Sequence, residues 1–352
     1  MKGRPRKYGT GDPSLDERLR EIVSEIQAPD PELTFEMLVT SIRMASAPLG
    51  RLDRKLINAA LKEMRYAFSV FARYRDRRKV TTFGSARTAP TDTEYALAVE
   101  FGRIAAAMGW MVVTGAGPGI MAAVNEGAGQ ESSFGVNIVL PFENQPNQFI
   151  AADPKLMNFR YFFTRKLMFI KEADAFVLFP GGFGTLDELF ELLTLIQTGK
   201  SDLHPVAMVQ PAGSDYWHGM DLALRHLLLE KGFINVEDLA FYHMTESPQE
   251  AMDHIATFYR VYHSQRYVGK KLILRLNWLP PVHVVAALND EFADILLGPI
   301  VPVGASPQEI RDDDVVDLPR LSVPFDRVHF GRLRALVDRL NATPGPAETA
   351  QS

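Results

Sequence analysis

The chain has no cysteine among its 352 residues. This absence excludes a disulfide framework, a thiolate metal site and a cysteine nucleophile, and it agrees with a cytoplasmic location. No apolar run approaches the ~20 residues that a membrane span needs, and the basic N-terminus lacks the apolar segment of a secretory signal. The net charge of -5 at pH 7 provides no overall attraction to nucleic acid or to an anionic membrane, so neither is expected as a partner.

Several catalytic and metal-binding signatures are missing as well. The eight histidines form neither His-x-x-x-His nor His-Glu-x-x-His, so no metal site is expected. The Gly-x-Ser-x-Gly turn of the α/β-hydrolases is absent. The glycine-rich turn at 115–119 lacks the Gly-Lys-Ser/Thr ending of a P-loop, which leaves other kinds of glycine-rich turn to be considered.

From residue 80 onward, short apolar strands alternate with helices. The expected strands are 80–83, 110–113, 134–140, 175–179 and 205–209, and the expected helices are 92–108, 119–128, 159–171, 184–197, 216–230 and 248–262. Strands separated by helices predict right-handed βαβ units and a parallel sheet. We therefore expect an α/β fold, a Rossmann-like doubly wound sheet over residues 80–265, with ligands bound at the C-terminal ends of its strands.

An N-terminal segment, residues 1–79, is expected to precede this domain. Its first 13 residues are predicted to be a disordered basic tail, and the rest to be helical. An apolar helix face is predicted from the spacing of Leu15, Leu19, Ile22 and Ile26.

A small α+β appendage is expected over residues 266–340. Its predicted elements are a strand at 272–276 and helices at 282–296 and 332–340, with the acidic run 311–314 in an exposed loop. The tail, 341–352, is predicted to be disordered from its composition.

The most informative segment is Phe179-Pro180-Gly181-Gly182-Phe183-Gly184-Thr185-Leu186-Asp187-Glu188, where a buried strand leads into a helix. Glycines let a ligand approach the backbone closely, and a helix N-terminus offers free N–H groups to a phosphate, with the Thr185 hydroxyl beside them. The Asp187–Glu188 pair, expected in the first helical turn, supplies a candidate acid or base. The alternative is a capped helix start in which Thr185 caps and the acids stabilise the helix dipole, which leaves the three glycines unexplained.

Two further glycine-rich turns also follow strands. One is Gly84-Ser85-Ala86, and the other contains Gly115, Gly117 and Gly119. Parallel strands end at one edge of a sheet, so all three turns are expected to build a single site. The second turn lacks the dinucleotide-binding spacing and the acidic residue that reads a ribose, so it favours a mononucleotide or sugar phosphate, with a tight turn that binds nothing as the alternative.

Three polar features accompany these turns. Arg165 and Lys166 can contact a phosphate or orient the acid, or form a solvated basic face. Asn137, inside an apolar strand, can bind a sugar hydroxyl or a base, or make a structural hydrogen bond. The basic cluster at 73–79 can bind an anion, although a solvated connector is favoured.

Together these motifs resemble those of the Lonely Guy family over roughly residues 80–265. Residues 180–188 match its Pro-Gly-Gly-x-Gly-Thr-x-x-Glu signature, residues 114–121 resemble its other glycine-rich motif, and Arg165-Lys166 matches its Arg-Lys pair. The resemblance implies a phosphoribohydrolase that cleaves a nucleoside 5′-monophosphate, AMP or a cytokinin riboside monophosphate, to free base and ribose 5-phosphate. It also implies a homo-oligomer, a dimer or a multiple of dimers, that needs no metal or other cofactor.

The resemblance assigns catalysis to Glu188 and Arg165. The expected substrate contacts are Gly115, Gly117, Gly119, Gly181, Gly182, Gly184, Thr185, Lys166, Ser85, Asn137 and Asp187. The chain departs from the family pattern at Ala116 and Pro118, and at Asp187, where many plant members carry Glu. A nucleotide- or cofactor-binding carrier without hydrolytic activity is the alternative function, because one fold serves several functions.

Overall fold

The computed structural model describes residues 8–140 and 145–345, in two compact units, Met1–Tyr66 and Ala67–Ser352. Three predicted features therefore fall wholly or partly outside the described residues: the start of the N-terminal tail, the strand end near residue 141, and the end of the C-terminal tail. In the part of the chain that is described, no helix is both long enough and apolar enough to cross a membrane.

The first unit is built on two packed helices, α1 (Pro13–Glu25) and α2 (Pro31–Ser46). Each helix begins with a proline that follows a capping aspartate, Asp12 or Asp30, whose carboxylate accepts hydrogen bonds from free N–H groups of the first turn. The small apolar core between them consists of Leu19, Val23, Phe35 and Val39.

The predicted apolar face of α1 is partly wrong. Leu19 is buried and Leu15 packs against the same core, but Ile22 and Ile26 are exposed, and Val23 takes the inward position instead. The predicted disorder of the N-terminal tail is also wrong for residues 8–13, because the Thr10 hydroxyl and backbone N–H both donate to Asp16.

A long helix, α3 (Arg51–Phe71), begins in the first unit and ends in the second. In the second unit its last residue, Phe71, stacks on Phe134 with ring centroids 4.6 Å apart. Part of the basic cluster after α3 serves the fold, because Arg77 donates to Gly109 O and Lys79 is buried with Nζ bonded to main-chain carbonyls. Arg73 and Arg75 are exposed, as the favoured solvated connector predicts.

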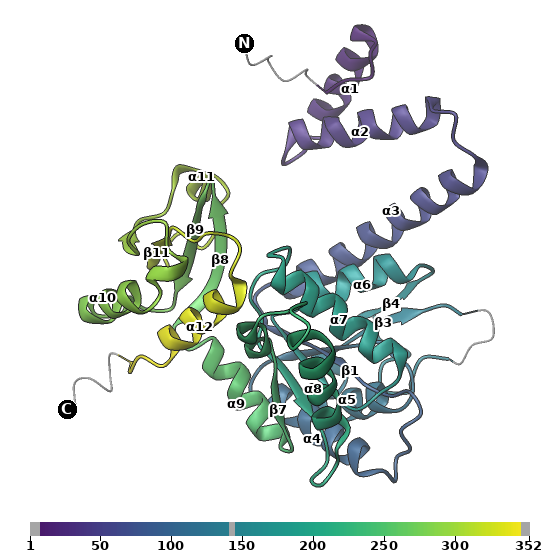
Figure 1. Cartoon of the computed structure of the whole chain (residues 1–352). Helices are drawn as coiled ribbons and strands as arrows, with labels where there is room; N and C mark the ends of the chain where they lie inside the picture. The colour runs from purple at the N-terminus through teal and green to yellow at the C-terminus, as the bar shows by residue number, and fades with distance from the viewer. Residues whose placement is uncertain (1–7, 141–144, 346–352) are drawn as a thin grey trace. The chain divides into compact units, whose positions relative to one another are not determined.

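The second unit contains a seven-stranded parallel sheet with the order β4-β3-β2-β1-β5-β6-β7, as expected (Figure 1). Its strands are β1 (Lys79–Phe83), β2 (Met111–Thr114), β3 (Ser133–Ile138), β4 (Leu156–Phe159), β5 (Ala175–Leu178), β6 (Val206–Val209) and β7 (His243–Thr245). Strands β1 to β4 progress in one direction and β5 to β7 in the other, so the direction of winding reverses between β1 and β5. Ligands of open α/β sheets bind at such a switch point.

Helices cover both faces of this sheet (Figure 1). The helices are α4 (Thr93–Ala107), α5 (Ile120–Ala128) and α9 (Pro248–Phe258) on one face, and α6 (Phe162–Lys171), α7 (Phe183–Gln197) and α8 (Tyr216–Leu224) on the other. Residues of α4, α5 and α9 share one apolar core with the sheet. On strand β1, Thr81 faces the other way, and its hydroxyl donates to Phe169 O of α6.

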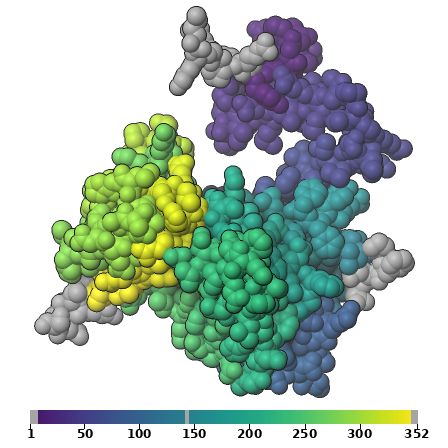
Figure 2. Space-filling model, in the orientation of Figure 1, coloured from purple at the N-terminus to yellow at the C-terminus, as the bar shows by residue number. Residues whose placement is uncertain are grey.

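A smaller antiparallel sheet, ordered β10-β11-β9-β8, follows and confirms the expected α+β appendage. Its elements are β8 (Tyr262–Val268), β9 (Lys271–Leu276), α10 (Val282–Glu291), β10 (Val301–Val303), α11 (Pro307–Arg311), β11 (Arg320–Val323) and α12 (Phe330–Asn341). Figure 2 shows its yellow-green surface against the teal and green α/β part, where the Arg334 guanidinium of α12 donates to His204 O. Short 3-10 or π turns lie at Ala72–Tyr74, Gln130–Ser132, Arg225–Leu229, Val236–Phe241 and Ala293–Ile295.

Several predicted boundaries need correction. The helix expected at 159–171 begins only at Phe162, because Leu156–Phe159 forms strand β4. The helix expected at 248–262 ends at Phe258, and strand β8 starts at Tyr262.

Side chains hold two segments of the appendage. The acidic run is largely exposed, as expected, and Asp312 and Asp314 both pair with Arg266. The expected tail does not begin at Asn341, which ends α12 with its buried side chain bonded to Val261 N and Tyr262 N.

Candidate functional site

The three glycine-rich turns meet at one edge of the sheet. They follow β2, β1 and β5, which are neighbours. The Ser85 N–H donates to Pro180 O, and Ser85 O accepts from the Ile120 N–H, both at 3.0 Å. The β1 turn is therefore bonded to the turn after β5 on one side and to the start of α5 on the other.

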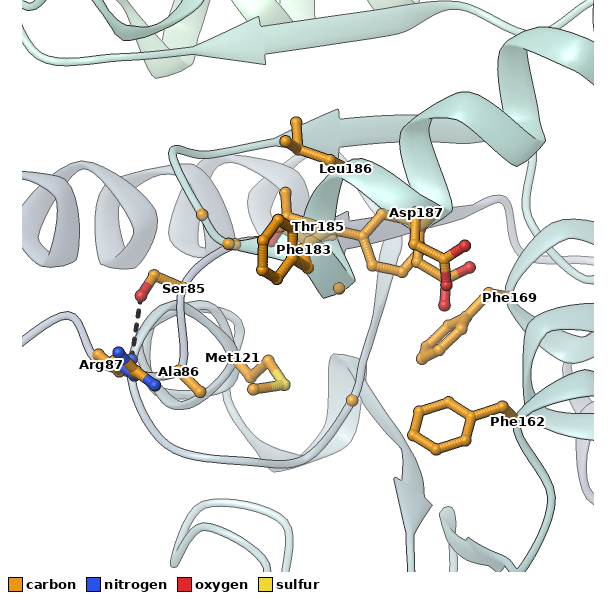
Figure 3. A pocket seen from close by; sticks show the side chains of 18 of the residues that line it. Ser85, Ala86, Arg87, Met121, Phe162, Phe169, Phe183, Thr185, Leu186 and Asp187 are labelled. Atoms are coloured by element: carbon orange, nitrogen blue, oxygen red, sulfur yellow. Dashed lines mark hydrogen bonds between the residues drawn. The ribbon is translucent and has the colours of Figure 1, made fainter.

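These turns surround a cavity of about 790 Å³ (Figure 3). Its lining residues are Thr82–Arg87, Gly115, Met121, Phe162, Arg165, Phe169 and Gly181–Glu188. The structure thus brings together the predicted residues Ser85, Gly115, Arg165 and the whole segment from Gly181 to Glu188.

The glycines of this site differ in what surrounds them. A Cβ on Gly181 would lie 2.1 Å from Thr185 Oγ1, and a Cβ on Gly119 would lie 2.2 Å from Ser85 O, so packing excludes any side chain there. Around Gly182 and Gly184, by contrast, a Cβ would meet no atom within 4 Å, and neither residue has a positive φ. Neither packing nor backbone conformation requires glycine at these two positions, which leaves close approach of a ligand as the physical reason.

Glu188 is a buried carboxylate on α7, facing the cavity. It is 8% exposed, and its Oε2 atom has no hydrogen-bond partner among the described residues. Burial raises the pKa of Glu188 from 4.5 to about 7, although the nearby Lys166 and Arg165 cations act to lower it. A carboxyl group near half-ionisation at neutral pH is suited to accept or donate a proton.

The helix start differs from the expected one. Its N-cap is Gly182 with no capping side chain, and the first turn contains no acidic residue. Asp187 and Glu188 therefore lie in the second turn of α7, which corrects the expected position. The alternative of an ordinary capped helix start, with Thr185 as the cap, is not what the structure shows.

Lys166 does not line the cavity, so the structure does not bring it together with the other expected substrate contacts. Its Nζ atom lies 2.6 Å from Glu191, 2.9 Å from Asp187 and 3.8 Å from Glu188. Burial lowers the pKa of Lys166, but hydrogen bonds to Glu191 and Asp187 outweigh this effect and raise it. Lys166 therefore balances the acidic side chains of α7.

Arg165 lines the cavity but is held by main-chain carbonyls. Its Nε donates to Val136 O at 2.8 Å and its guanidinium also reaches Gly115 O at 3.4 Å. A Cβ on Gly115 would lie 2.3 Å from this guanidinium, so Gly115 provides the space that Arg165 occupies. The arrangement fixes a positive charge close to Glu188.

Asn137 lies outside this cavity, apart from the other expected substrate contacts. Its amide donates to Asn158 of the neighbouring strand β4, in a separate hollow of the surface. This is the structural hydrogen bond that the sequence left open as an alternative. Gly117 and Gly119 also lie outside the main cavity lining.

Some cavity residues were not named as site residues from the sequence: Thr82, Phe83, Arg87, Phe162 and Phe169. Arg87 follows Ser85 by two residues, and its proximity to a glycine-rich turn was the only available signal. Met121, which also lines the cavity, belongs to the glycine-rich motif at 114–121 and lies two residues after Gly119, whereas the distant Phe162 carried no motif of its own.

A family described as "Possible lysine decarboxylase" matches residues 121–255. A cytokinin riboside 5'-monophosphate phosphoribohydrolase of Mycobacterium tuberculosis is 31% identical over 155 residues, which cover 42% of this chain and 77% of that protein. A probable enzyme of the same name from Oryza sativa subsp. japonica is 33% identical over 116 residues, 32% of this chain and 49% of the rice protein. The match thus spans about half of the rice protein's length. The chain belongs to the Lonely Guy family.

Among solved structures, the molybdenum cofactor carrier protein of Chlamydomonas reinhardtii shows 18% identity and a TM-score of 0.36, covering 51% of this chain and 96% of that one. A molybdenum cofactor binding protein of Rippkaea orientalis shows 19% identity and a TM-score of 0.34, covering 51% of this chain and 96% of that one. Likenesses this weak carry no argument about the ligand.

The burial of Glu188 has a consequence for stability. Because its pKa is raised from 4.5 to about 7, the folded state binds a proton more tightly than the unfolded state. Wild-type stability should therefore fall as pH rises through this window, by at most about 3 kcal/mol at about 1.4 kcal/mol per pKa unit. Glu188→Gln cannot titrate, so its stability relative to wild type should increase between pH 5 and pH 8.

Urea unfolding of both proteins at the two pH values measures this difference. An equal difference at pH 5 and pH 8 would show that the pKa of Glu188 is not raised in the folded state.

Proposed function

We propose that this chain is a phosphoribohydrolase that cleaves the N-glycosidic bond of nucleoside 5′-monophosphates, AMP or cytokinin riboside monophosphates. The observation that carries the proposal is Glu188, a buried carboxylate in the cavity that also contains the glycine-rich start of α7, with one oxygen that accepts no hydrogen bond from the described residues. Burying a carboxylate oxygen without a hydrogen bond costs free energy, which a binding scaffold has no reason to retain. The names of the relatives point to the same reaction.

The start of α7 is the proposed phosphate site. Gly182 and Gly184 line the cavity and leave open space above the backbone. The helix N-terminus there has no capping side chain, so free N–H groups and the positive end of the dipole are available to an anion. Binding the unreactive phosphate would supply free energy for orienting the anomeric carbon.

Glu188 then acts at the anomeric carbon. Cleavage of the bond to the base nitrogen passes through a transition state like an oxocarbenium ion, which a nearby carboxylate stabilises. Ionised Glu188 accepts a proton from water as the water oxygen bonds to the anomeric carbon and the bond to the base nitrogen breaks. That proton then passes to the departing base, which leaves Glu188 ionised again. Arg165, whose guanidinium is bonded to the carbonyls of Val136 and Gly115, keeps a positive charge beside the Glu188 carboxylate.

Glu188→Gln should lower turnover about 10²–10⁴-fold, the range typical of a general acid or base. The matched control is Asp187→Asn, because this adjacent carboxylate is mostly exposed and pairs with Lys166. Release of base and ribose 5-phosphate from AMP, followed by chromatography, measures both variants. If Glu188→Gln kept more than half of the wild-type activity, Glu188 would have no part in the mechanism. If the wild-type protein bound AMP but did not cleave it, the carrier function would be favoured.

Gly184→Ala tests the phosphate site separately from the chemistry. A Cβ at this position meets no protein atom within 4 Å, so folding and thermal stability should be retained. The added methyl group should nevertheless obstruct a phosphate against the backbone and raise the KM for AMP about tenfold or more, a loss of about 1.4 kcal/mol. An unchanged KM would place the phosphate elsewhere in the cavity.

We propose further that the protein forms a homo-oligomer through the exposed apolar residues near the cavity. These are Phe162, Phe163 and Leu167 on α6, and Phe183 and Phe190 on α7. A group of exposed large apolar side chains is typical of an interaction surface. Light scattering should give a mass of at least two chains, reduced by Phe163→Asp, and a monomer at every concentration would contradict this proposal.

A further inference from the structure

Two arginines line the cavity, and they differ in what holds their side chains. The Arg165 guanidinium is bonded to the carbonyls of Val136 and Gly115. The Arg87 side chain is exposed, and within the described residues its guanidinium makes no hydrogen bond or ion pair. Arg87 therefore has its donors available for a ligand.

The main chain beneath Arg87 is nevertheless fixed. Its N–H donates to Ser85 Oγ at 3.0 Å, which closes a tight turn. The Ser85 backbone is in turn bonded to Pro180 and Ile120. A rigid turn thus places an unpaired cation at the rim of the cavity, with little main-chain entropy left to lose on binding.

The cavity is electrically asymmetric. Figure 3 shows Ser85 and Arg87 at one end and Asp187 with Phe162 at the other, with Thr185 between them. Glu188 lies next to Asp187 in the chain and lines the same cavity. The carboxylates repel a phosphate, and the Arg165 guanidinium near Glu188 is already engaged by main-chain carbonyls, so a phosphorylated ligand gains most with its phosphate toward Arg87.

We propose that Arg87 makes this site select nucleoside monophosphates over nucleosides, by pairing with the 5′-phosphate held at the start of α7. The inference rests on the proposed function for the identity of the ligand. It adds the residue that discriminates by charge and the direction in which the substrate lies. The guanidinium can form two parallel hydrogen bonds to phosphate oxygens, a geometry that lysine cannot reproduce.

Binding measured without turnover tests this inference. Isothermal titration of AMP and of adenosine into Glu188→Gln gives the reference affinities, and Arg87→Ala is then added to that protein. Removing the arginine should weaken AMP binding about 10–100-fold, as expected for hydrogen bonds to a charged group, and change adenosine binding less than threefold. Arg87→Lys should recover part of the lost AMP affinity.

The control is Arg103→Ala in the same protein. Arg103 is exposed on α4 and does not line the cavity. The Arg103→Ala substitution therefore removes the same charge without changing the site. Its AMP affinity should stay within twofold. The inference would be overturned if Arg87→Ala lost affinity for AMP and adenosine equally, or lost no affinity for AMP. It would also be overturned if AMP failed to bind the reference protein, Glu188→Gln.

The hydrolysis assay separates this inference from the proposed function. A wild-type protein that binds AMP in an Arg87-dependent manner but releases no base would disprove the hydrolase and leave the role of Arg87 intact. If the wild-type protein cleaved AMP and the Arg87→Ala variant kept its full preference for AMP over adenosine, the hydrolase would be supported. The proposed role of Arg87 would then be overturned.

Discussion

The backbone of Ser85 links the glycine-rich turns that border the cavity, and the parallel sheet positions these turns. The Ser85 N–H donates to the turn after β5, and its carbonyl accepts from the first residue of α5. These two hydrogen bonds hold three strand ends, from β2, β1 and β5, in a fixed relation at the point where the sheet changes winding direction. The glycine-rich start of α7, the Ser85–Arg87 turn and the Gly115 turn border one cavity because of this arrangement.

Burial and charge act against each other around Glu188. Packing of α7 removes the carboxyl group from water and raises its pKa, while the cations of α6 limit that rise. Lys166 also neutralises the neighbouring acids, Asp187 and Glu191, which would otherwise raise the pKa further. The Arg-Lys pair thus splits into two roles, because Arg165 faces the cavity and Lys166 faces the acids of α7.

The sequence predicted the architecture well because a parallel sheet is buried on both faces, and its central strands are therefore continuous apolar runs. The edge strands β4 and β7 were missed because they are short and partly exposed, with polar residues such as Asn158 and His243. Helix boundaries were misplaced where one element follows another directly, as at Phe159 and Tyr262. The position of each glycine-rich turn directly after a strand was sufficient to predict that the three turns meet.

The details of the site depend on tertiary packing and were harder to predict. Nothing in the sequence indicated that Lys166 would face three carboxylates, because this depends on how α6 lies beside α7. The pairing of Asn137 with Asn158 depends on β4, which had not been predicted. Arg87 carried no motif, and only the fixed turn and its unpaired guanidinium set it apart.

A crystal structure of the Glu188→Gln variant with AMP would show which atoms of the nucleotide lie at which end of the cavity. We expect it to show the phosphate at the start of α7 beside Arg87, and the anomeric carbon next to the side chain at position 188. A phosphate bound at the Asp187 end, or an anomeric carbon out of reach of position 188, would contradict this arrangement.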